Sequence, residues 1–363
     1  MMSVEQIWKK IINRKGLTLL AIPGFCLWLI SLFYRSFLGV RRLLASRPEK
    51  LSLPVISVGN ITVGGTGKTP LVGFLAGALE DEGLKVGIVS SAYGRRDQKP
   101  FLEPGYRLQR MNVAVTGDEV QLLAQQVPNV IFSVANSKLD AARALAESGD
   151  VDVIILDDGF QHTKLARDIN IVAFDAAVKR RVMRPFPAGT LRENIKGLSR
   201  ADIIIITRAK FAKDITKLSE TVQGYSTTAE LYNARFSATT LSNQRRSFPV
   251  KYLEDKSLFL FAGIGNFQAL RKQVDALCSD LDGWLEFDDH QQYTQETVDR
   301  INRLANRHDS DLLLTTAKDW AKLAHFKFDR ELFYLDLVID LDPGEETLIR
   351  NIMKRLMFHP EKR

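Results

Sequence analysis

Short apolar runs rich in Val and Ile alternate with helical stretches between residues 51 and 223 of the chain. In the helical stretches, apolar side chains recur every three or four positions, as they do on one face of an α-helix. This alternation is typical of βαβ units that build a largely parallel sheet. We expect strands at Val55–Val58, Val86–Val89, Val153–Leu156, Ile169–Phe174 and Ile203–Thr207, and helices at Leu71–Glu82, Val120–Gln126, Ser137–Glu147 and Phe211–Thr221.

The pattern changes in the last third of the chain. From Gly224 to Lys256 polar residues dominate and the periodicity is lost, so a connection between domains is expected there. A second, smaller α/β unit should follow this connection. Its expected strands are Leu258–Ala262, Leu312–Thr316 and Phe333–Leu337, and its expected helix is Gln295–Asn306.

The 363 residues are 45% hydrophobic and 26% charged, which excludes a disordered chain and is enough to bury a sizeable core. This length exceeds what a single core usually serves, so two domains are expected. The two cysteines, Cys26 and Cys278, lie far apart and match no metal spacing. A disulfide-stapled secreted fold and a structural zinc site are therefore not expected, and the compartment is expected to be reducing.

The positive charge of the chain is concentrated at its N-terminal end. The formal net charge is +7, and residues 1–50 alone hold nine basic and two acidic side chains. The other 313 residues therefore carry 41 charges of each sign. A neutral body argues against a nucleic-acid-binding surface, whereas a basic N-terminal segment favours an anionic membrane surface.

An uncharged stretch, Leu17–Tyr34, lies within these fifty residues and has basic residues on both sides. Eighteen residues is short for a spanning helix, and Pro23-Gly24 interrupts the run, so a shallow or re-entrant insertion is expected. No small-residue cleavage pattern follows the run, which argues against a signal peptide. The segment is therefore expected to anchor the chain on the cytoplasmic face of a membrane, with an ordinary core helix as the alternative.

The most specific signal in the chain is the segment Ser57–Pro70, which reads SVGNITVGGTGKTP. A strand leads into a glycine-rich turn and a helix follows, which is the setting of a phosphate-binding loop. Glycines let backbone N–H groups surround phosphate oxygens, Lys68 can reach the β- and γ-phosphates, and Thr69 is placed to bind Mg²⁺. The strict pattern has glycine where Thr62 stands, so the loop departs from it there. The residues expected to bind the nucleotide are Thr62, Val63, Gly64, Gly65, Thr66, Gly67, Lys68 and Thr69.

Acidic residues follow three apolar runs. An apolar strand ends in Asp157-Asp158, which suits the Mg²⁺ partner of a phosphate-binding loop because parallel strands present their carboxyl ends at the nucleotide. Its alternative is a solvated strand end. Gly117-Asp118-Glu119 follows the short run Val113–Val115 and opens a helix, where helix capping is the simpler interpretation. Asp288-Asp289-His290 follows the run Trp284–Phe287, and a histidine in such a place is usually a surface residue.

Taken together, these segments resemble the lipid A 4′-kinase family, also called the tetraacyldisaccharide 4′-kinases, which are peripheral inner-membrane enzymes of Gram-negative bacteria. The resemblance covers almost the whole chain and keeps the family's order of motifs. Besides the apolar N-terminal segment it rests on Val58–Pro70, Gly117-Asp118-Glu119, Asp157–His162, Arg167-Asp168, Pro187-Ala188-Gly189, Leu191-Arg192-Glu193, Phe261–Asn266, Asp289-His290 and Lys318-Asp319. The implied reaction is ATP-dependent phosphorylation of the 4′-hydroxyl of a tetraacylated glucosamine disaccharide 1-phosphate, which gives the bisphosphate precursor of lipid A.

The resemblance also implies roles for individual residues. Asp118 would be the base that accepts the proton of the sugar hydroxyl, paired with His290 from the second domain. Lys68 and the amides of the loop would hold the triphosphate of ATP. The implied Mg²⁺ ligands, direct or through water, are Thr69, Glu119, Asp157 and Asp158. Further residues of the same region, without an assigned role, are Gln161, His162, Arg192 and Glu193.

The chain departs from the family pattern at a few positions. Ser91-Ala92 stands where the family has Arg-Gly, so an arginine that could neutralise phosphate is missing, although Arg95-Arg96 lies close by. Val120 and Phe267 replace prolines, and Ala317 replaces a glutamate. None of these changes removes a proposed catalytic group.

Two other functions remain open on the sequence. One is a membrane-bound ATPase of the partitioning or site-selection kind, whose related loop carries a signature lysine where this chain has Val63, and whose membrane helix is usually C-terminal. The other is a lipid-binding module that uses no nucleotide. That function would leave Lys68, Thr69 and Asp157 without a role.

The expected fold class is α/β, with a P-loop kinase-like, doubly wound and largely parallel sheet, a second smaller α/β domain and an N-terminal membrane-associated helix. Residues 1–50 would form the membrane-associated segment, 51–230 the P-loop nucleotide-binding domain, 231–257 a linker and 258–363 the smaller domain. ATP is expected as substrate with Mg²⁺, and the expected partners are a lipid disaccharide and an anionic membrane surface. We expect no nucleic acid and no obligate protein partner, and a peripheral or monotopic location on the cytoplasmic face of the bacterial inner membrane.

Overall fold

The computed structural model describes residues 4–13, 21–44, 46–63, 66–91, 100–111, 113–243, 245–265, 267–288, 291–323 and 325–357. Some residues that the sequence singles out lie outside these ranges, namely Gly64, Gly65, Ala92, Arg95, Arg96, Asn266, Asp289 and His290. Contacts between Cα atoms divide the chain into two compact units. Unit 1 takes residues 1–104, 129–235 and 340–363, and unit 2 takes residues 105–128 and 236–339.

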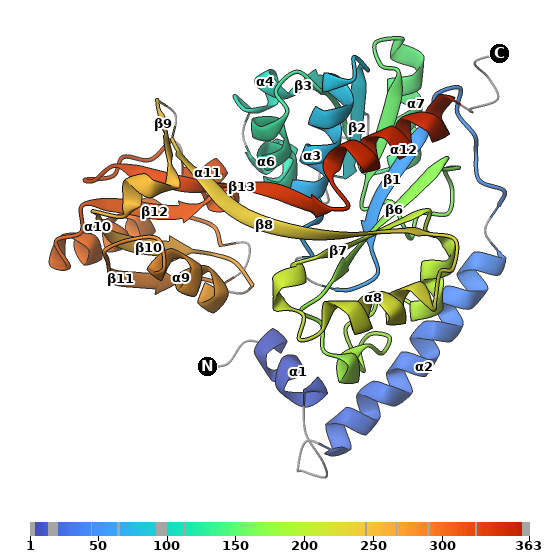
Figure 1. Ribbon diagram of the computed structural model, residues 1–363, viewed down its shortest axis with the longest axis horizontal. Helices are drawn as coiled ribbons and strands as arrows, with labels where there is room; N and C mark the ends of the chain where they lie inside the picture. The colour runs from blue at the N-terminus through green and yellow to red at the C-terminus, as the bar shows by residue number, and fades with distance from the viewer. Residues whose placement is uncertain are drawn as a thin grey trace. The chain divides into compact units, whose positions relative to one another are not determined.

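Unit 1 is an α/β unit with a parallel sheet (Figure 1). Its strands are β1 (Val55–Asn60), β2 (Val86–Ser91), β3 (Phe101–Pro104), β4 (Ile131–Ala135), β5 (Val153–Asp157), β6 (Ile169–Asp175), β7 (Ile203–Thr207) and the first part of β8 (Glu230–Ser242). Its helices are α1 (Val4–Ile12), α2 (Ala21–Leu43), α3 (Lys68–Asp81), α7 (Lys138–Ser148), α8 (Ile215–Gln223) and α12 (Glu345–Met357), with short 3₁₀ turns η1 (Arg180–Val182), η2 (Ile195–Arg200) and η3 (Ala209–Phe211).

The strand order in this unit is β8-β7-β6-β1-β5-β2-β4-β3, and only the β3–β4 pair is antiparallel among the pairings of described residues. All residues of β1, β5 and β7 are buried, as expected when helices cover both faces of a parallel sheet. Helix α3 connects β1 to β2, and α7 connects β4 back to β5, in the opposite direction along the sheet. Because such crossovers are right-handed, the two helices cover opposite faces, which is the doubly wound arrangement.

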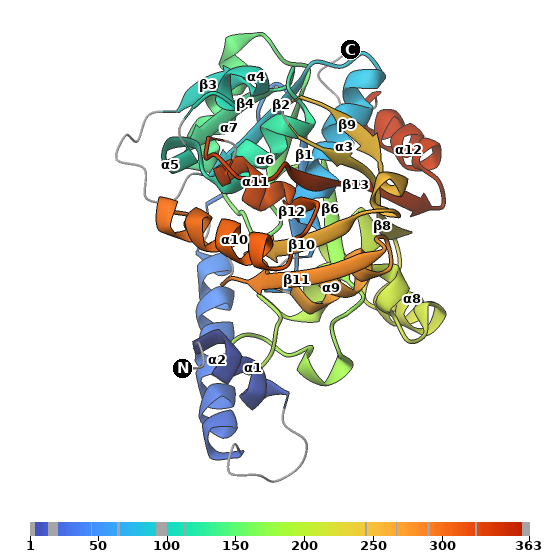
Figure 2. The same ribbon diagram turned by 90° about the vertical axis from the view of Figure 1, so that its left-hand side faces the viewer.

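Unit 2 is a smaller α/β unit, whose elements are labelled in Figure 2. Its strands are the second part of β8, β9 (Ser247–Pro249), β10 (Ser257–Ala262), β11 (Asp280–Glu286), β12 (Leu312–Thr316) and β13 (Leu332–Asp342), in the order β11-β10-β12-β13-β8 with β9 paired to β8. Its helices are α4 (Gly105–Leu108), α5 (Val113–Thr116), α6 (Asp118–Gln126), α9 (Phe267–Asp275), α10 (Gln295–Arg307) and α11 (Ala317–Leu323), with the 3₁₀ turn η4 (Val250–Leu253).

The alternation of side chains along β10 explains how unit 2 is layered. Leu258 and Leu260 pack in one cluster with Val274 of α9, and Phe259 and Phe261 pack in another with residues of α10. Successive side chains of a strand point to opposite faces, so α9 and α10 cover opposite faces of this part of the sheet.

The fold class expected from the sequence is confirmed: the described residues form 13 strands in a mostly parallel mixed sheet, with one long apolar N-terminal helix. Every strand expected from the apolar runs is present. The stretch 231–257, expected as a linker, instead contains most of β8 together with β9 and η4. Residues Val113–Val115, expected as an apolar run before a turn, belong to the helix α5, so Asp118 follows a helix rather than a strand.

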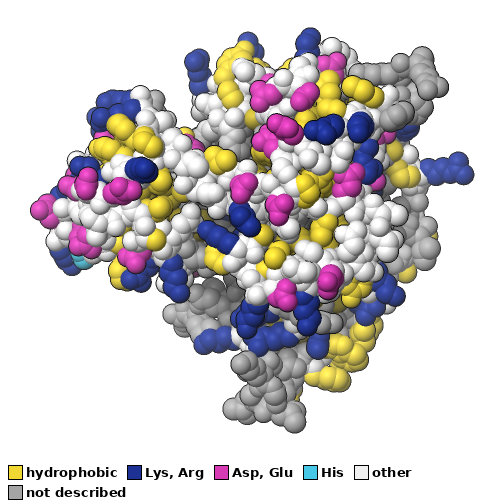
Figure 3. Space-filling view, in the orientation of Figure 1, with side chains coloured by type: hydrophobic (Ala, Val, Ile, Leu, Met, Phe, Trp, Pro, Cys, Tyr) yellow, Lys and Arg dark blue, Asp and Glu magenta, His cyan; other side chains and the backbone are white. Residues whose placement is uncertain are grey.

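Helix α2 is long and apolar enough to cross a membrane by length and composition, and only 11% of its apolar window is buried. The expected interruption at Pro23-Gly24 is wrong, because the helix begins at Ala21 and its first turn tolerates proline. Large apolar side chains are exposed along it, with Ile22 at 75% and Phe33 at 77%. Figure 3 shows such side chains gathered at the lower right, over the region that α2 occupies in Figure 1.

Candidate active site

The loop between β1 and α3 is braced against its neighbours by main-chain and side-chain hydrogen bonds. The Asn60 side-chain amide donates to Thr66 Oγ1 at 2.9 Å, and Thr207 Oγ1 donates to the Thr66 carbonyl at 2.7 Å. The Val63 amide donates to the Thr190 carbonyl at 2.7 Å. Val63 and Thr66 are therefore held by β1, by the end of β7 and by the segment before η2.

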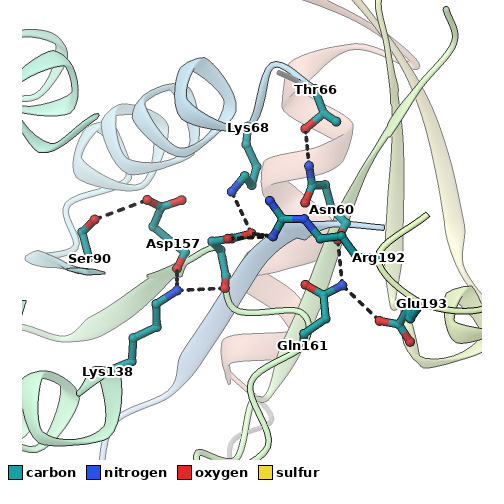
Figure 4. A network of polar contacts seen from close by, with 10 residues as sticks. Asn60, Thr66, Lys68, Ser90, Lys138, Asp157, Gln161, Arg192 and Glu193 are labelled. Carbon is teal, nitrogen blue, oxygen red and sulfur yellow. Dashed lines mark hydrogen bonds and ion pairs between the residues drawn. The ribbon is translucent and has the colours of Figure 1, made fainter. Parts of the chain in front are cut away.

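Three cations surround the Asp158 carboxylate and the carbonyls of Asp157 and Asp158 where α3 begins and β5 ends (Figure 4). Lys68 Nζ pairs with Asp158 Oδ1 at 2.7 Å, and Arg192 donates from NH1 to both carboxylate oxygens at 2.9 and 2.8 Å. Lys138 Nζ donates to the carbonyls of Asp157 and Asp158 at 2.6 and 2.9 Å. We call these five residues the phosphate-loop cluster. Its cations converge on the N-terminus of α3, which is a site suited to a phosphate anion.

Burial and charge oppose each other in this cluster. Burial alone would raise the pKa of Asp158, but the Lys68 and Arg192 cations outweigh it and hold that pKa well below its usual range. Burial lowers the pKa of Lys138, and the Asp158 and Asp157 carboxylates partly offset this. Asp158 also has a left-handed backbone, with φ 50°. Such a conformation costs energy for a residue other than glycine and is concentrated at functional sites.

The residues expected around Mg²⁺ do not all belong to one unit. Thr69 in the first turn of α3, Asp157 and Asp158 belong to unit 1, whereas Glu119 belongs to unit 2. The Asp157 side chain is 3% exposed, and Ser90 Oγ donates to its Oδ2 at 3.4 Å. Across the described ranges, no group of three or more His, Cys, Asp and Glu side chains is arranged to hold a metal. A Mg²⁺ that relies on phosphate oxygens and water needs only one or two protein oxygens, so Thr69 and Asp157 fit it.

Gln161 and Glu193 link neighbouring segments of the site by hydrogen bonds, and we call this pair the frame of the site. The Gln161 amide donates to the Asn60 carbonyl at 2.8 Å and to Glu193 Oε1 at 3.0 Å. Glu193 is 2% exposed and accepts both bonds of Arg200 at 2.9 and 3.0 Å. These contacts hold the end of β1, the turn after β5 and the segment before η2 together. Thr62, whose side chain is fully buried, belongs to the same frame.

A cavity of about 930 Å³ lies between α2 and the phosphate-loop cluster. We call it the α2 cavity. Arg41 of α2 donates to the Gln161 carbonyl at 3.3 Å, and burial together with nearby cations, Lys138 first among them, lowers the pKa of His162 to about 4. On the α2 side the lining is apolar apart from Arg41, and the other side carries the cations Lys138, Lys164 and Arg192. Its lining residues are Phe37, Val40, Arg41, Leu44, Ser46, Ser91, Asn136, Ser137, Lys138, Asp158, Gln161, His162, Thr163, Lys164 and Arg192.

A second cavity, of about 640 Å³, lies at the carboxyl ends of β6 and β7. Asp175 and Arg208, at the ends of these two strands, are joined by an ion pair with Nε to Oδ1 at 2.8 Å. We call this cavity the β6–β7 cavity. The residues lining it are Ala176, Ala177, Val178, Lys179, Arg181, Met183, Phe211, Ala212, Lys213, Asp214, Lys217, Leu218 and Thr221.

Asp118 is the first residue of α6 in unit 2, after Gly117 with φ 88°. Its Oδ2 pairs with Lys322 Nζ at 2.6 Å, and the two side chains are only 15% and 5% exposed. Lys322 also donates to the carbonyl of Gln291 at 3.1 Å. His290, the expected partner of Asp118, lies outside the described residues, but Gln291 directly follows it in the sequence.

Sequence reasoning missed two lysines of these sites. Lys138 follows the N-cap Ser137 of an expected helix, at the end of a short strand, β4, that was not expected. Lys322 lies one turn after the Lys318-Asp319 motif, and only its place on α11 brings it to Asp118. The position of Lys138 at the start of a helix in a βαβ unit could have indicated that it lies near the ends of the strands. Lys322 lies in the last turn of a short helix, α11, and carries no comparable signal.

Comparison with known proteins connects these sites to a family. Residues 24–357 match the model of the tetraacyldisaccharide-1-P 4′-kinase family. Tetraacyldisaccharide 4′-kinases of Halothermothrix orenii and Chlorobaculum parvum are each 32% identical to this chain, over 83% and 95% of it and 83% and 96% of their own length. The crystal structure of Aquifex aeolicus LpxK in complex with ATP superposes with a TM-score of 0.75 at 28% identity, covering 92% of this chain and 99% of that one. The chain therefore belongs to the tetraacyldisaccharide 4′-kinase family.

Proposed function

We propose that this chain transfers the γ-phosphoryl group of ATP to the 4′-hydroxyl of a tetraacylated glucosamine disaccharide 1-phosphate in lipid A biosynthesis. The enzyme is a phosphotransferase with an alcohol acceptor. The observation that carries the proposal is the phosphate-loop cluster, where Lys68 and Arg192 converge on one carboxylate at the N-terminus of α3. A nucleotide phosphate is an anion that can replace the Asp158 carboxylate as their partner.

In the proposed reaction, the segment Thr62–Thr69 surrounds the triphosphate and Lys68 reaches the β- and γ-phosphates. Arg192 and Lys138 add charge that stabilises the transferring group, which is where phosphoryl transfer gains most of its rate. Mg²⁺, when bound, would neutralise the phosphate oxygens. Thr69 and Asp157 would hold it, with Asp158 and Glu119 as further candidates.

The β6–β7 cavity is the proposed site of the adenine base. In this proposal the γ-phosphate lies near Lys68 and Asp158, and Asp158 follows β5, the neighbour of β1 on one side. The base must then extend to the other side of β1, where β6 and β7 end. Thr207, the last residue of β7, donates to the carbonyl of Thr66 in the phosphate-binding loop, and its own carbonyl accepts the amide of Ala176, which lines the cavity.

The α2 cavity is the proposed entry for the lipid acceptor. Phe37, Val40 and Leu44 offer apolar surface to acyl chains, and Arg41 and Lys164 offer cations to the acceptor's phosphate. The exposed apolar face of α2 would keep the enzyme at the cytoplasmic face of the inner membrane, peripheral or monotopic, where the acceptor resides. The basic N-terminal segment adds attraction to anionic lipid. The proposal needs neither a nucleic acid nor an obligate protein partner.

In the same proposal, Asp118 accepts the proton of the 4′-hydroxyl while that oxygen forms its bond to phosphorus. The bond between the γ-phosphorus and the bridging oxygen breaks, and ADP leaves. His290 assists Asp118 by sharing or relaying the proton.

The decisive measurement is transfer of ³²P from ATP to the disaccharide 1-phosphate in detergent micelles. We expect Lys68→Ala to lower transfer by about 10²-fold or more, because it removes a charge that meets the phosphates. Asp158 keeps Arg192 as a partner in this variant, so the fold should persist. Lys85→Ala is the matched control, since Lys85 is exposed and precedes β2 at the opposite end of the strands. Activity of Lys68→Ala within tenfold of wild type would contradict the proposal.

ATP hydrolysis that proceeds without phosphorylation of any lipid acceptor would instead favour the ATPase of the partitioning or site-selection kind. A double-mutant cycle tests the proposed acid–base pair. Asp118→Ala should lower kcat strongly and leave the affinity for ATP nearly unchanged, and His290→Ala should lower kcat by about 10²-fold. Because the two act as one unit, their effects should not multiply in the double variant. Strictly additive free energies would mean that His290 acts independently.

A further inference from the structure

Lys322 is a buried lysine in the second turn of α11, with only 6% of its surface exposed. Burying an ammonium group is costly unless it is paired and hydrogen-bonded. Lys322 meets this need with the Asp118 carboxylate at 2.6 Å and the Gln291 carbonyl at 3.1 Å. One ammonium therefore joins Asp118 to the residue that follows His290.

The position of Lys322 is set by Asp319, one turn earlier on α11. Asp319 is fully buried, and its Oδ2 accepts hydrogen bonds from the Gly263 amide at 3.0 Å and from Thr316 Oγ1 at 2.7 Å. These bonds fix the start of α11 to the ends of β10 and β12. With that start fixed, the side chain three residues on has little freedom in where it points.

Gly263 in turn permits the close approach of Asp288 and Gln291. A Cβ atom on Gly263 would lie 2.9 Å from the Asp288 carbonyl oxygen and 2.9 Å from Cβ of Gln291. Any side chain at residue 263 would push these two residues away. The Gln291 amide also donates to the Asp288 carbonyl at 3.1 Å, which keeps the two residues that flank Asp289-His290 together.

We propose that Lys322 is a positioning residue, which holds the Asp118 carboxylate and the carbonyl of Gln291, the residue after His290 in the sequence, at a fixed spacing. The inference rests on the proposed function, in which Asp118 accepts the hydroxyl proton. Lys322 does not meet the substrate; it restrains the orientation of the group that does. The Asp118 Oδ2 and the Gln291 carbonyl oxygen can be no further apart than the sum of their two distances to Nζ. Gly263 and Asp319, which belong to two motifs of the sequence, thereby gain a role, since they fix the position of α11 and so the direction of the Lys322 side chain.

The test compares Lys322→Met, which keeps the length and removes the charge, with wild type and with Lys322→Arg. We expect Lys322→Met to lower kcat by about 10²-fold, the usual effect of displacing a reacting group by about 1 Å. The KM for ATP should stay within threefold of wild type, because the nucleotide-binding residues belong to unit 1. Lys322→Arg keeps the positive charge and should recover at least tenfold of the lost kcat. Lys327→Met, at an exposed position of the same unit, is the matched control and should leave kcat unchanged.

A second variant, in which Asp118 is also changed, separates an effect on kcat from an effect on the stability of the fold. Removing one member of a buried ion pair leaves the other charge unpaired and destabilises the fold, whereas Asp118→Asn with Lys322→Met removes both charges. This double variant should be as stable as wild type in thermal melting and should lose no more kcat than Asp118→Asn alone. Multiplicative losses of kcat would overturn the inference, because they would show that Lys322 acts apart from Asp118.

Chemical rescue separates positioning from a purely structural role. Lys322→Ala leaves a space that methyl-, ethyl- or propylammonium can fill, and the added amine should restore kcat in a saturable manner that depends on amine length. No rescue by any of the three amines in folded protein would overturn the inference. If Asp118→Asn keeps wild-type kcat, the proposed base and this inference both fail. If Asp118→Asn is inactive while Lys322→Met keeps kcat within threefold of wild type, only the positioning role fails.

Discussion

Helix α1 is attached to the body of unit 1 through Trp8. Its indole N–H donates to the Pro187 carbonyl at 2.8 Å, and its ring lies 5.7 Å from that of Phe186. Three residues further on, the carbonyl of Thr190 accepts the amide of Val63 in the phosphate-binding loop. One short segment thus contacts the N-terminal helix at one end and the proposed nucleotide site at the other. We predict that Trp8→Ala loosens this segment and reduces the protection of its amides.

The magnitude follows from the two lost contacts. The hydrogen bond contributes about 0.5–1.5 kcal/mol and the aromatic pair about 0.5–1.5 kcal/mol, so the docking of α1 weakens by about 1–3 kcal/mol. At 1.4 kcal/mol for each factor of ten, the docking equilibrium shifts about 5- to 150-fold. Trp8→Phe keeps a ring and loses only the N–H, so it should produce the smaller part of this shift.

Hydrogen–deuterium exchange of residues 186–192 measures the effect directly. Exchange in Trp8→Ala should be faster by about the same factor, and the amide of Val63 should exchange faster with it, because its acceptor moves. Trp28→Ala is the matched control, since Trp28 stacks on Phe25 of its own helix. Unchanged exchange in Trp8→Ala, or an equal change in the control, would refute the coupling between α1 and the loop.

Three further predictions address stability and membrane binding. The pKa of His162 lies at about 4 in the fold and at about 6.5 in the unfolded chain, so its contribution to stability is complete above about pH 6.5 and is lost as the pH falls toward 4. His162→Gln should flatten the pH dependence of chemical denaturation in this range by about 1–2 kcal/mol, because water screens the part of the ring that is exposed. Gly189→Ala should lower the free energy of unfolding by about 1–3 kcal/mol in urea denaturation, because a Cβ there collides with the main-chain carbonyls of Val182 and Arg184. Deletion of residues 1–40 should release the protein from anionic vesicles in co-sedimentation and raise the KM for the lipid acceptor more than that for ATP, and full retention would mean that the anchor lies elsewhere.

The sequence by itself determined those features that depend on neighbouring residues. The strands that are buried on both faces carry continuous apolar runs, so β1, β5 and β7 could be read directly. The phosphate-binding loop could also be read, because its glycines and Lys68 lie in one short segment. Family membership followed from the order of such local motifs.

Elements whose side chains are only partly buried could not be predicted from the sequence. The strand β8 alternates between buried and exposed positions and crosses a polar stretch, so it resembled a linker. Helix α5 was missed because four residues carry too little periodicity to separate a helix from a strand. In both cases, pairing and packing with distant segments outweigh the local pattern.

Only the tertiary structure decided which charges meet. Lys138 reaches the carbonyls after β5 because β4 and β5 end at the same edge of the sheet, and Lys322 reaches Asp118 across about 200 residues of sequence because α11 packs on α6. The grouping of residues 105–128 with unit 2 is likewise invisible in the sequence. An ion pair depends on distances of a few ångströms between side chains, and those distances are set by the packing of whole elements rather than by the residues beside each charge.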